Sequence, residues 1–452
     1  MRVLLVSTNT MTRPYSVYPL GLDYVIDSIP AGHDVKSVDV NELQGGEQAL
    51  LAVIGDFRPD VIGISIRNID NIDEANTETF VDSVRSLISG IRRCSGAVIV
   101  LGGSGFTILP REFMAAVDAD FGVIGEGERF PLLLDALEGK TPVNDIPGVI
   151  MKDGPAEAEY PAPLTDLHGL GAIPETSYRQ LYIRRGGMLN LQTKRGCPFQ
   201  CVYCTYPLIE GGAFRCAEPE MAARNARMLQ DAGAKYIYIA DSTFNGSYDH
   251  SLKVALAFKK EGVSIPWGGF FTPTPAPAGY YRTLADTGLR HVEFGTEALS
   301  DPVLEAYRKP FRVKSVLESH RLAVEAGLHV AHYLMPGGPG ENEATLRESL
   351  ANCDKLEKTV FFIFGGVRIY PHTGLFEIAV REGQITADAN FLDPAFYWSP
   401  GLDRNRAVEI ITNHAAGRTN WIIGSGPRGM YRMMDRLHAW GHVGPLWERL
   451  IK

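Results

Sequence analysis

Three cysteines lie within eight residues of one another, and their spacing is the feature of this sequence best suited to chemistry. Cys197, Cys201 and Cys204 form a C-x3-C-x2-C pattern in the stretch KRGCPFQCVYCTYP. Three thiolates on a compact loop can each hold one iron of a cubane iron–sulfur cluster. The fourth iron then has no protein ligand and is open to a small molecule. The pattern therefore favours a [4Fe-4S] cluster with one reactive iron.

Zinc and a disulfide fit this loop less well. A structural zinc site takes a fourth protein ligand, and the loop holds no further Cys or His. A disulfide would leave one of the three thiols over, and six cysteines in 452 residues do not make a disulfide scaffold. Cys94 and Cys353 are expected to be bystanders. Cys216 is expected to be one too, although it lies close enough in sequence to act as a neighbouring or catalytic thiol.

Two series of alternating strand and helix patterns must position these residues, so the fold class is α/β. The second series predicts a TIM-like barrel that is six-eighths complete, with the cysteine loop after its first strand. Its strands are expected at residues 188–194, 236–240, 267–271, 291–294, 329–335 and 361–370. The first series predicts a doubly wound parallel sheet. Its strands are expected at residues 2–7, 33–40, 60–66, 97–102 and 120–125, with helices near 20–29, 47–57, 74–93 and 110–118.

The loops after the first-series strands are small and polar, and ligands of such sheets bind at that edge. Glycines there allow a backbone to approach a ligand closely. The candidates are Ser65, Arg67, Asn68, Gly102, Gly103, Ser104, Gly125, Glu126 and Gly127. The expected domains are a sheet domain (1–140), a Pro-rich linker (141–186), a barrel (187–384) and a helical C-terminal region (385–452). Residues 401–452 carry eight Arg or Lys against four acids, so this last region is locally basic.

The barrel segment resembles the radical SAM enzymes, from about residue 187 to 383. Their cysteine loop carries an aromatic residue before the third cysteine, here Tyr203. The resemblance implies a [4Fe-4S] cluster and S-adenosyl-L-methionine (SAM), which yields a 5′-deoxyadenosyl radical that abstracts hydrogen from a substrate. It also implies SAM contacts after later strands. The matching positions are Asp241 and Ser242 for the amino group, Glu297 in GTEA for the ribose, and Gly338 in the GPGE turn. Arg368 on the sixth strand is a candidate partner for the SAM carboxylate or the substrate.

Residues 1–140 resemble the cobalamin-binding domain that precedes many radical SAM barrels. The matching stretches are 58–68, 98–106 and 123–128. The D-x-H-x-x-G motif that supplies a histidine to cobalt is absent, and His33 lies at a strand start, so we expect no histidine below the cobalt. Arg67 and Asn68 are expected against the lower face of the corrin, and the glycines, Ser104 and Glu126 against the corrin and its tail. The alternative for this loop is a capped turn, with Asp70 or Asp73 as N-cap of the 74–93 helix.

The two resemblances together imply a cobalamin-dependent radical SAM methyltransferase acting on a carbon or phosphorus centre of a small molecule. A rearrangement, ring contraction or cyclisation with the same cofactors is the alternative. A methylthiotransferase would need three more cluster cysteines in the first domain, and a cobalamin sensor would not need the cysteine loop. An electron donor such as flavodoxin or ferredoxin is an expected partner, and no peptide-leader-binding domain is recognisable.

Charge and hydropathy exclude other classes of function. The net charge of −9 argues against a general nucleic-acid binder. No apolar run is long enough for a membrane span. The start MRVLLVST is better explained as a first strand than as a secretory signal, so we expect a cytoplasmic protein.

Overall fold

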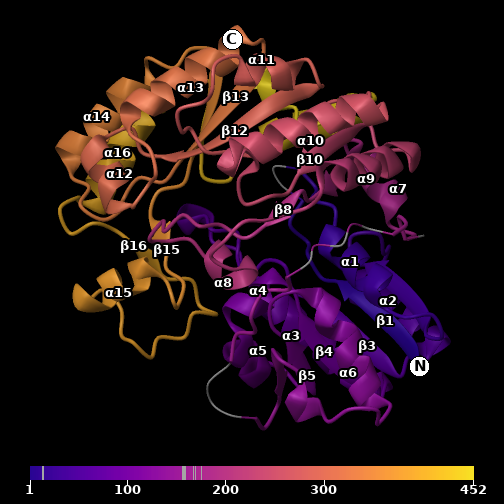
Figure 1. The fold of residues 1–452 in the computed structure, drawn as a ribbon. Coiled ribbons are helices and arrows are strands. Elements are labelled where there is room, and N and C mark those ends of the chain that lie inside the picture. The colour runs from indigo at the N-terminus through magenta and orange to yellow at the C-terminus, as the bar shows by residue number, and fades with distance from the viewer. Residues whose placement is uncertain are drawn as a thin grey trace.

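The computed structural model describes residues 1–12, 15–154, 159–165, 167, 169, 171–174 and 176–451. Two α/β units lie one above the other, with the segment that carries the cysteines between them (Figure 1). Each unit is built on its own sheet, of six strands in the first and seven in the second. Nearly all of these strands are parallel, so the expected α/β fold class is confirmed.

The first sheet has the strand order β2-β1-β3-β4-β5-β6, and only β6 runs antiparallel to its neighbour. Its strands are β1 (Arg2–Ser7), β2 (Asp34–Asp39), β3 (Val61–Ser65), β4 (Val98–Gly102), β5 (Phe121–Val123) and β6 (Val149–Met151). Its helices are α1 (Leu20–Ser28), α2 (Gly46–Phe57), α3 (Val81–Cys94), α4 (Ser104–Ile108), α5 (Pro110–Ala116) and α6 (Phe130–Leu137). The five expected strands are confirmed. The helix expected at 74–93 begins only at Val81, because Asp73 caps a separate short 3-10 helix η1 (Glu74–Asn76).

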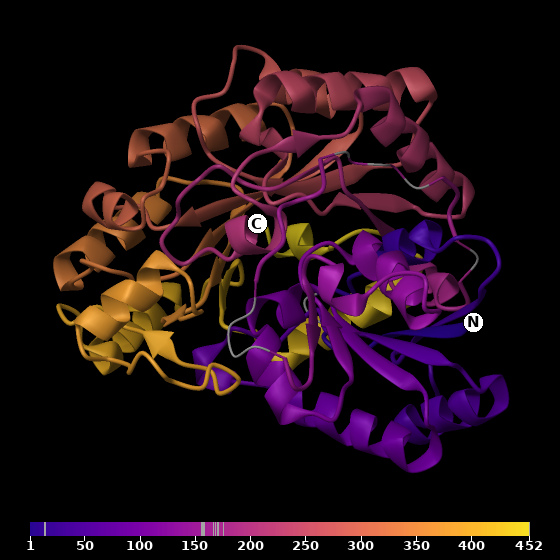
Figure 2. The same cartoon turned by 60° about the horizontal axis from the view of Figure 1, so that its bottom comes forward.

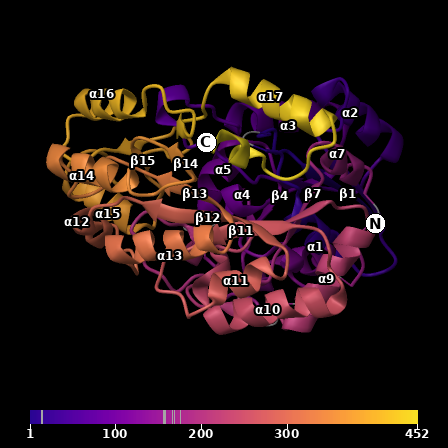
Figure 3. The same cartoon turned by 90° about the horizontal axis from the view of Figure 1, so that it is seen from above.

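The second sheet has the order β17-β14-β13-β12-β11-β10-β7 and is parallel throughout. Its strands are β7 (Met188–Leu191), β10 (Tyr236–Ile239), β11 (Trp267–Phe271), β12 (Leu289–Glu297), β13 (His329–Leu334), β14 (Thr359–Ile363) and β17 (Trp421–Ile423). Helices cover its outer face, as Figure 3 shows for α10, α11 and α13. The helices of this unit up to residue 381 are α7 (Arg179–Arg184), α8 (Tyr206–Glu210), α9 (Pro219–Asp231), α10 (Tyr248–Glu261), α11 (Tyr280–Ala285), α12 (Asp301–Ala306), α13 (Val313–Glu325), α14 (Glu343–Cys353) and α15 (Gly374–Arg381).

The C-terminal region differs from the expected helical appendage. It contains α16 (Arg404–Ala415), β17, α17 (Arg428–Ala439) and a short 3-10 helix η5 (Trp447–Leu450). Strand β17 pairs with β14, so this region completes the barrel sheet with a seventh strand. The expected sixth strand is also shorter, since β14 ends before Gly365, and β15 (Val367–Arg368) pairs separately with β16 (Phe396–Tyr397). Tyr431, Met434 and Trp447 pack with Ala331 and Phe362 on the inner face of the sheet.

Two histidines in the barrel wall form a buried hydrogen-bonded chain. His332 bonds Thr296 at 2.7 Å and His320 at 3.0 Å, and His320 also bonds the Glu357 carbonyl at 2.9 Å. Burial lowers the pKa of both imidazoles, that of His320 to about 4. His332 is thus a core histidine held by polar partners, which is the ordinary role of a buried histidine in a barrel wall.

The buried His320–His332 pair predicts that the barrel is sensitive to acid. Below pH 6.5, His320 is protonated in the unfolded protein but stays neutral in the folded protein. The stability of the fold is therefore full above pH 6.5 and falls as the pH decreases toward 4. Between pH 8 and 5, His320 alone contributes a loss of about 2 kcal/mol. Urea unfolding at both pH values measures the difference, which should be smaller in His320→Gln. An equal loss in the variant would contradict this origin.

Candidate active site

The cysteine loop is held in place by backbone bonds to three other segments. Strand β7 leads into a short strand β8 (Lys194–Arg195), which pairs with β9 (Arg215–Cys216). The Cys197 N–H bonds Gly211 O at 3.0 Å. The Val202 N–H bonds Tyr307 O at 3.2 Å, and its carbonyl accepts from Leu375 at 2.7 Å. The loop therefore has a fixed path on which all three thiols lie near one another.

The donor chemistry of the three thiols fits an iron–sulfur cluster. Burial raises the pKa of all three thiols, that of Cys204 to about 12. The charge of Cys197 also acts on Cys201, and those of Cys201 and Cys197 act on Cys204, so the three thiols lie within electrostatic range of one another. Three neighbouring cysteines on one loop would each hold one iron of a cubane.

Glu297 lies beside this loop, paired with a residue that the sequence did not single out. The hydroxyl of Tyr203 donates to Glu297 Oε1 at 2.5 Å, and Lys309 Nζ lies 3.0 Å from Glu297 Oε2. Burial works against the charge of Lys309, yet Glu297 and the cysteine sulfurs keep its pKa above the ordinary value. Glu297 and Tyr203 thus lie together at the cysteine loop, and Lys309 adds a cation there that the sequence did not predict.

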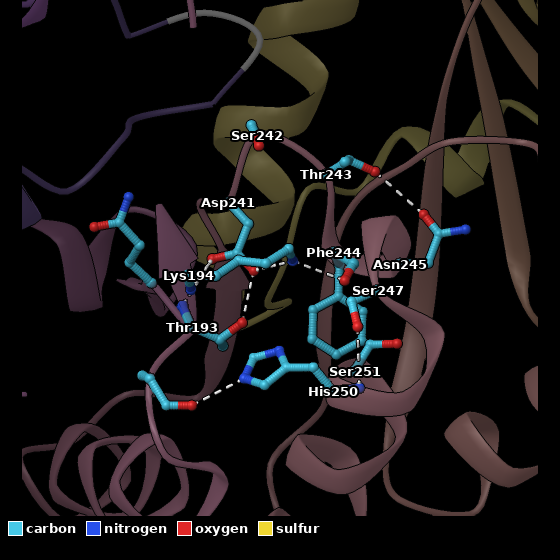
Figure 4. A network of polar contacts seen from close by, with 12 residues as sticks. Thr193, Lys194, Asp241, Ser242, Thr243, Phe244, Asn245, Ser247, His250 and Ser251 are labelled. Carbon is cyan, nitrogen blue, oxygen red and sulfur yellow. Dashed lines mark hydrogen bonds and ion pairs between the residues drawn. The ribbon is translucent and has the colours of Figure 1, made fainter. Parts of the chain in front are cut away.

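Asp241 is already saturated by protein donors. Its carboxylate accepts from Thr193 N at 2.7 Å, Thr193 Oγ1 at 2.6 Å and Lys194 Nζ at 2.8 Å (Figure 4). Asp241 and Lys194 are fully buried as an ion pair at the root of the cysteine loop. Its neighbour Ser242 donates to Gly196 O at 2.9 Å, next to Cys197. Of the two residues expected at the SAM amino group, Ser242 is the less engaged.

Glu126 joins the two units instead of facing open solvent beyond the first sheet. Its Oε1 lies 2.8 Å from both Arg195 and Arg215, and Arg195 also pairs with Glu128. Arg195 directly precedes Gly196 and Cys197, so this bridge ties the loop after β5 to the cysteine loop. A Cβ at Gly127 would meet Val25 at 2.5 Å, and Gly125 has a left-handed φ of +79°, so both positions favour glycine on local grounds as well. The expected contact of these three residues with cobalamin stays a prediction.

Among the expected cobalamin contacts, Arg67 keeps its side chain accessible to a ligand. Its side chain is solvent-exposed, although Tyr15, Tyr206 and Tyr238 lie near enough to act on its charge. Tyr206, in α8 just after the cysteines, is 36% exposed and lies within electrostatic range of Arg67, so both side chains are accessible near the domain boundary. Arg67 NH1 also bonds Asn68 Oδ1 at 2.9 Å.

The glycine loop after β4 shapes the Arg67 segment. Ser104 Oγ donates to Arg67 O at 3.1 Å, and a Cβ at Gly103, whose φ is +98°, would lie 2.6 Å from Ile66 O. Ser65 lies at the end of β3, where its carbonyl accepts from Thr8, and Gly102 ends the neighbouring strand. Guanidinium, amide and hydroxyl groups thus line this edge, and the described part of it holds no histidine. His33 lies at the opposite end, near Met1 and Glu138. This donor set fits a corrin without a histidine ligand.

Arg368 and Gly338 are both packed against other residues of the protein. Arg368 is 5% exposed; its Nε lies 2.8 Å from Asp70, and its other nitrogens bond Ile369 O and Phe391 O at 2.7 Å. The bridge joins the two units, and the expected contact of Arg368 with SAM or substrate stays a prediction. A Cβ at Gly338 would lie 2.2 Å from the Tyr307 ring, so the glycine makes room for that ring.

The inner face of the barrel carries an aromatic lining around one buried carboxylate. Glu293 accepts from Tyr333 at 2.9 Å, Trp447 at 3.0 Å, Tyr238 at 3.2 Å and Tyr15 at 3.5 Å. Burial raises its pKa against these donors. Tyr15 and Trp447 come from the two ends of the chain, which Figure 2 draws in indigo and yellow on the same side of the barrel. The sequence could not have revealed this convergence.

Two family models match the chain in the order that this geometry suggests. Residues 6–134 match the B12 binding domain, and residues 191–353 match the Radical SAM superfamily. Together they span well over half of the chain, which belongs to the cobalamin-dependent radical SAM enzymes. Its resident groups are a [4Fe-4S] cluster, SAM and cobalamin. No helix among the described residues is long and apolar enough to cross a membrane.

Three similar proteins are methyltransferases by name. An uncharacterised methyltransferase of Pyrococcus horikoshii is 28% identical over 80% of this chain and 79% of its own length. The tryptophan 2-C-methyltransferase of Streptomyces laurentii is 24% identical over 82% of this chain and 73% of its own. The radical SAM methyltransferase TsrM of Kitasatospora setae, solved with cobalamin and a [4Fe-4S] cluster bound, has a TM-score of 0.87 at 22% identity, over 99% of this chain and 97% of its own. That structural likeness establishes the fold.

Proposed function

We propose that this protein is a methyltransferase that moves a methyl group from SAM, by way of cobalamin, to a carbon or phosphorus centre of a small molecule. The observation that carries the proposal is the packing of α8, which directly follows the cysteine loop, against α4 of the first unit, whose Ser104 donates to the Arg67 carbonyl. When bound there, the cluster, cobalamin and SAM supply one-electron chemistry and a transferable methyl group. The names of the methyltransferase relatives support this proposal over a rearrangement.

The residues of the chain have distinct roles in this proposal. Cys197, Cys201 and Cys204 would hold the cluster, and Ser242 would contact SAM. Arg67 and Asn68 would contact the corrin and disfavour a further ligand to its cobalt. The aromatic inner face of the barrel, with Tyr238, Phe270 and Tyr333 in ring contact, excludes water from the substrate. An electron donor such as flavodoxin or ferredoxin completes the system.

The aromatic lining favours a planar substrate, and tryptophan is the first candidate, as in the relative's name. Flat side chains stack on such rings and bury large apolar area. The test is anaerobic reconstitution with iron, sulfide and hydroxocobalamin, followed by mass spectrometry with methyl-deuterated SAM. Methyl transfer predicts S-adenosylhomocysteine and a substrate that carries the deuterated methyl group. Formation of 5′-deoxyadenosine without transfer of the deuterated methyl group would favour a rearrangement. If SAM were not cleaved at all, the protein would instead act as a cobalamin carrier.

Arg67 and Asn68 can be tested apart from turnover. In Arg67→Ala and Asn68→Ala we expect cobalamin retention to fall roughly tenfold, which corresponds to about 1.4 kcal/mol of binding free energy, and the spectrum of bound cob(II)alamin to change. Gel filtration followed by absorbance and EPR spectroscopy measures both. Arg93→Ala, an exposed arginine of α3, is the matched control. If both test variants retained cobalamin as well as the wild type and gave the same cob(II)alamin spectrum, Arg67 and Asn68 would have no role in binding cobalamin.

A further inference from the structure

Lys309 reaches the cysteine loop from a segment that no motif marks. It follows α12, where Tyr307 O accepts from Val202 of the cysteine loop. Arg308 then adopts a left-handed φ of +55°, and the side chain of the next residue reaches Tyr203 of the cysteine loop. The Lys309 side chain is only 7% exposed. A buried lysine needs partners for its charge, because leaving one unpaired costs several kcal/mol.

Two groups beside the cysteine loop hold this ammonium. Nζ lies 3.0 Å from Glu297 Oε2 and donates to the hydroxyl oxygen of Tyr203 at 3.2 Å. The rings of Tyr203 and Phe311 flank it with centroids at 5.6 and 5.3 Å. Because Tyr203 lies between Cys201 and Cys204 in the sequence, these contacts hold the ammonium against the cysteine loop.

We propose that Lys309, held against Tyr203 of the cysteine loop and balanced by Glu297, is a positioning residue that sets the reduction potential of the cluster. The cluster would gain negative charge when a one-electron reductant supplies one electron to it. A buried cation beside the cluster loop stabilises that reduced form, and a buried carboxylate does the opposite. Salt screens buried charges weakly, so both effects persist at ordinary ionic strength.

Glu297 gains a second role from this arrangement. Its two oxygens are taken by Tyr203 and Lys309, so the carboxylate holds the lysine in place and offsets its charge. Glu297 itself has a φ of +60°, a left-handed conformation that is strained for a non-glycine residue. In this conformation its carboxylate meets Tyr203 of the cysteine loop. The pair thus acts as one unit whose two charges pull the potential in opposite directions.

The midpoint potential of the cluster tests this proposal without any methyl acceptor. The holoenzyme is titrated with dithionite, and the EPR signal of the reduced cluster is followed in K309M, E297Q, K309M/E297Q and K309R. We expect a more negative midpoint in K309M, a less negative one in E297Q and an intermediate one in the double variant. K309R, which keeps the cation, should stay near wild type. K253M, at an exposed lysine of α10, is the matched control and should not shift.

Iron and sulfide per chain are measured alongside the potentials. Loss of the cluster in K309M with recovery in K309M/E297Q would also support the proposal, because the unpaired carboxylate then repels the cluster. Midpoints of K309M and E297Q that equal the wild-type value, or that move in the same direction, would overturn it. An unchanged E297Q midpoint overturns it even where K309M holds no cluster. None of these outcomes depends on whether the protein transfers methyl groups.

Discussion

Alanine in place of Cys197, Cys201 or Cys204 is expected to reduce bound iron from about four atoms per chain to nearly none, since two thiolates do not retain a cubane. SAM cleavage and product formation should both fall to background in all three variants. The absorbance contributed by the iron–sulfur cluster should be lost with the iron. Metal analysis of anaerobically purified protein, with cobalamin content measured on the same samples, checks the result.

The other cysteines provide the controls. Cys216 lies on β9 opposite Lys194, and like Cys94 it is exposed to solvent. Cys216→Ala and Cys94→Ala should keep full iron and normal activity. Full iron in Cys201→Ala would mean that another residue is the ligand, and loss of iron in Cys216→Ala would mean that the bystander assignment is wrong. Cobalamin content should hold in every variant, because its site lies mainly on the first unit.

The strands were predictable because their signal is local. Runs such as Val61–Ser65 and Val98–Gly102 are apolar over a strand length and end in small polar residues, which is the pattern of a buried parallel strand. The cysteine loop was predictable for a similar reason, since its three ligands lie on one short segment. By contrast, β17 has only three residues, and it was hidden in a sequence with strong helical patterns on both sides.

The polar bridges were not predictable from the sequence. Glu126 follows β5 and Arg368 lies in β15, yet each pairs with the other unit, across 69 residues to Arg195 and 298 residues to Asp70. Lys309 lies in a loop without any motif. Which of several polar side chains at a strand end meets a ligand depends on long-range packing, and local spacing carries no information about that.

The buried pair of Lys194 and Asp241 leads to the largest expected loss of stability. Both side chains are 0% exposed and 2.8 Å apart, and Lys194 also donates to Phe244 O at 2.8 Å. Lys194→Met removes the cation and leaves a buried carboxylate with only the Thr193 and backbone donors. An uncompensated buried charge of this kind costs about 3–5 kcal/mol. Urea unfolding followed by far-UV circular dichroism should therefore show a clearly lower midpoint.

The double variant Lys194→Met/Asp241→Asn separates the pair from the packing around it. Removing both charges leaves no unpaired ion, so its loss should be smaller than the sum of the two single losses. Lys253→Met is the matched control, since Lys253 pairs with Asp249 at 2.6 Å but both are exposed, and it should leave the midpoint unchanged. Additive losses would mean that the pair is not coupled. Lys194 lies three residues before Cys197. If the two charges are coupled, the buried Lys194–Asp241 pair therefore also helps to fix the position of the cysteine loop.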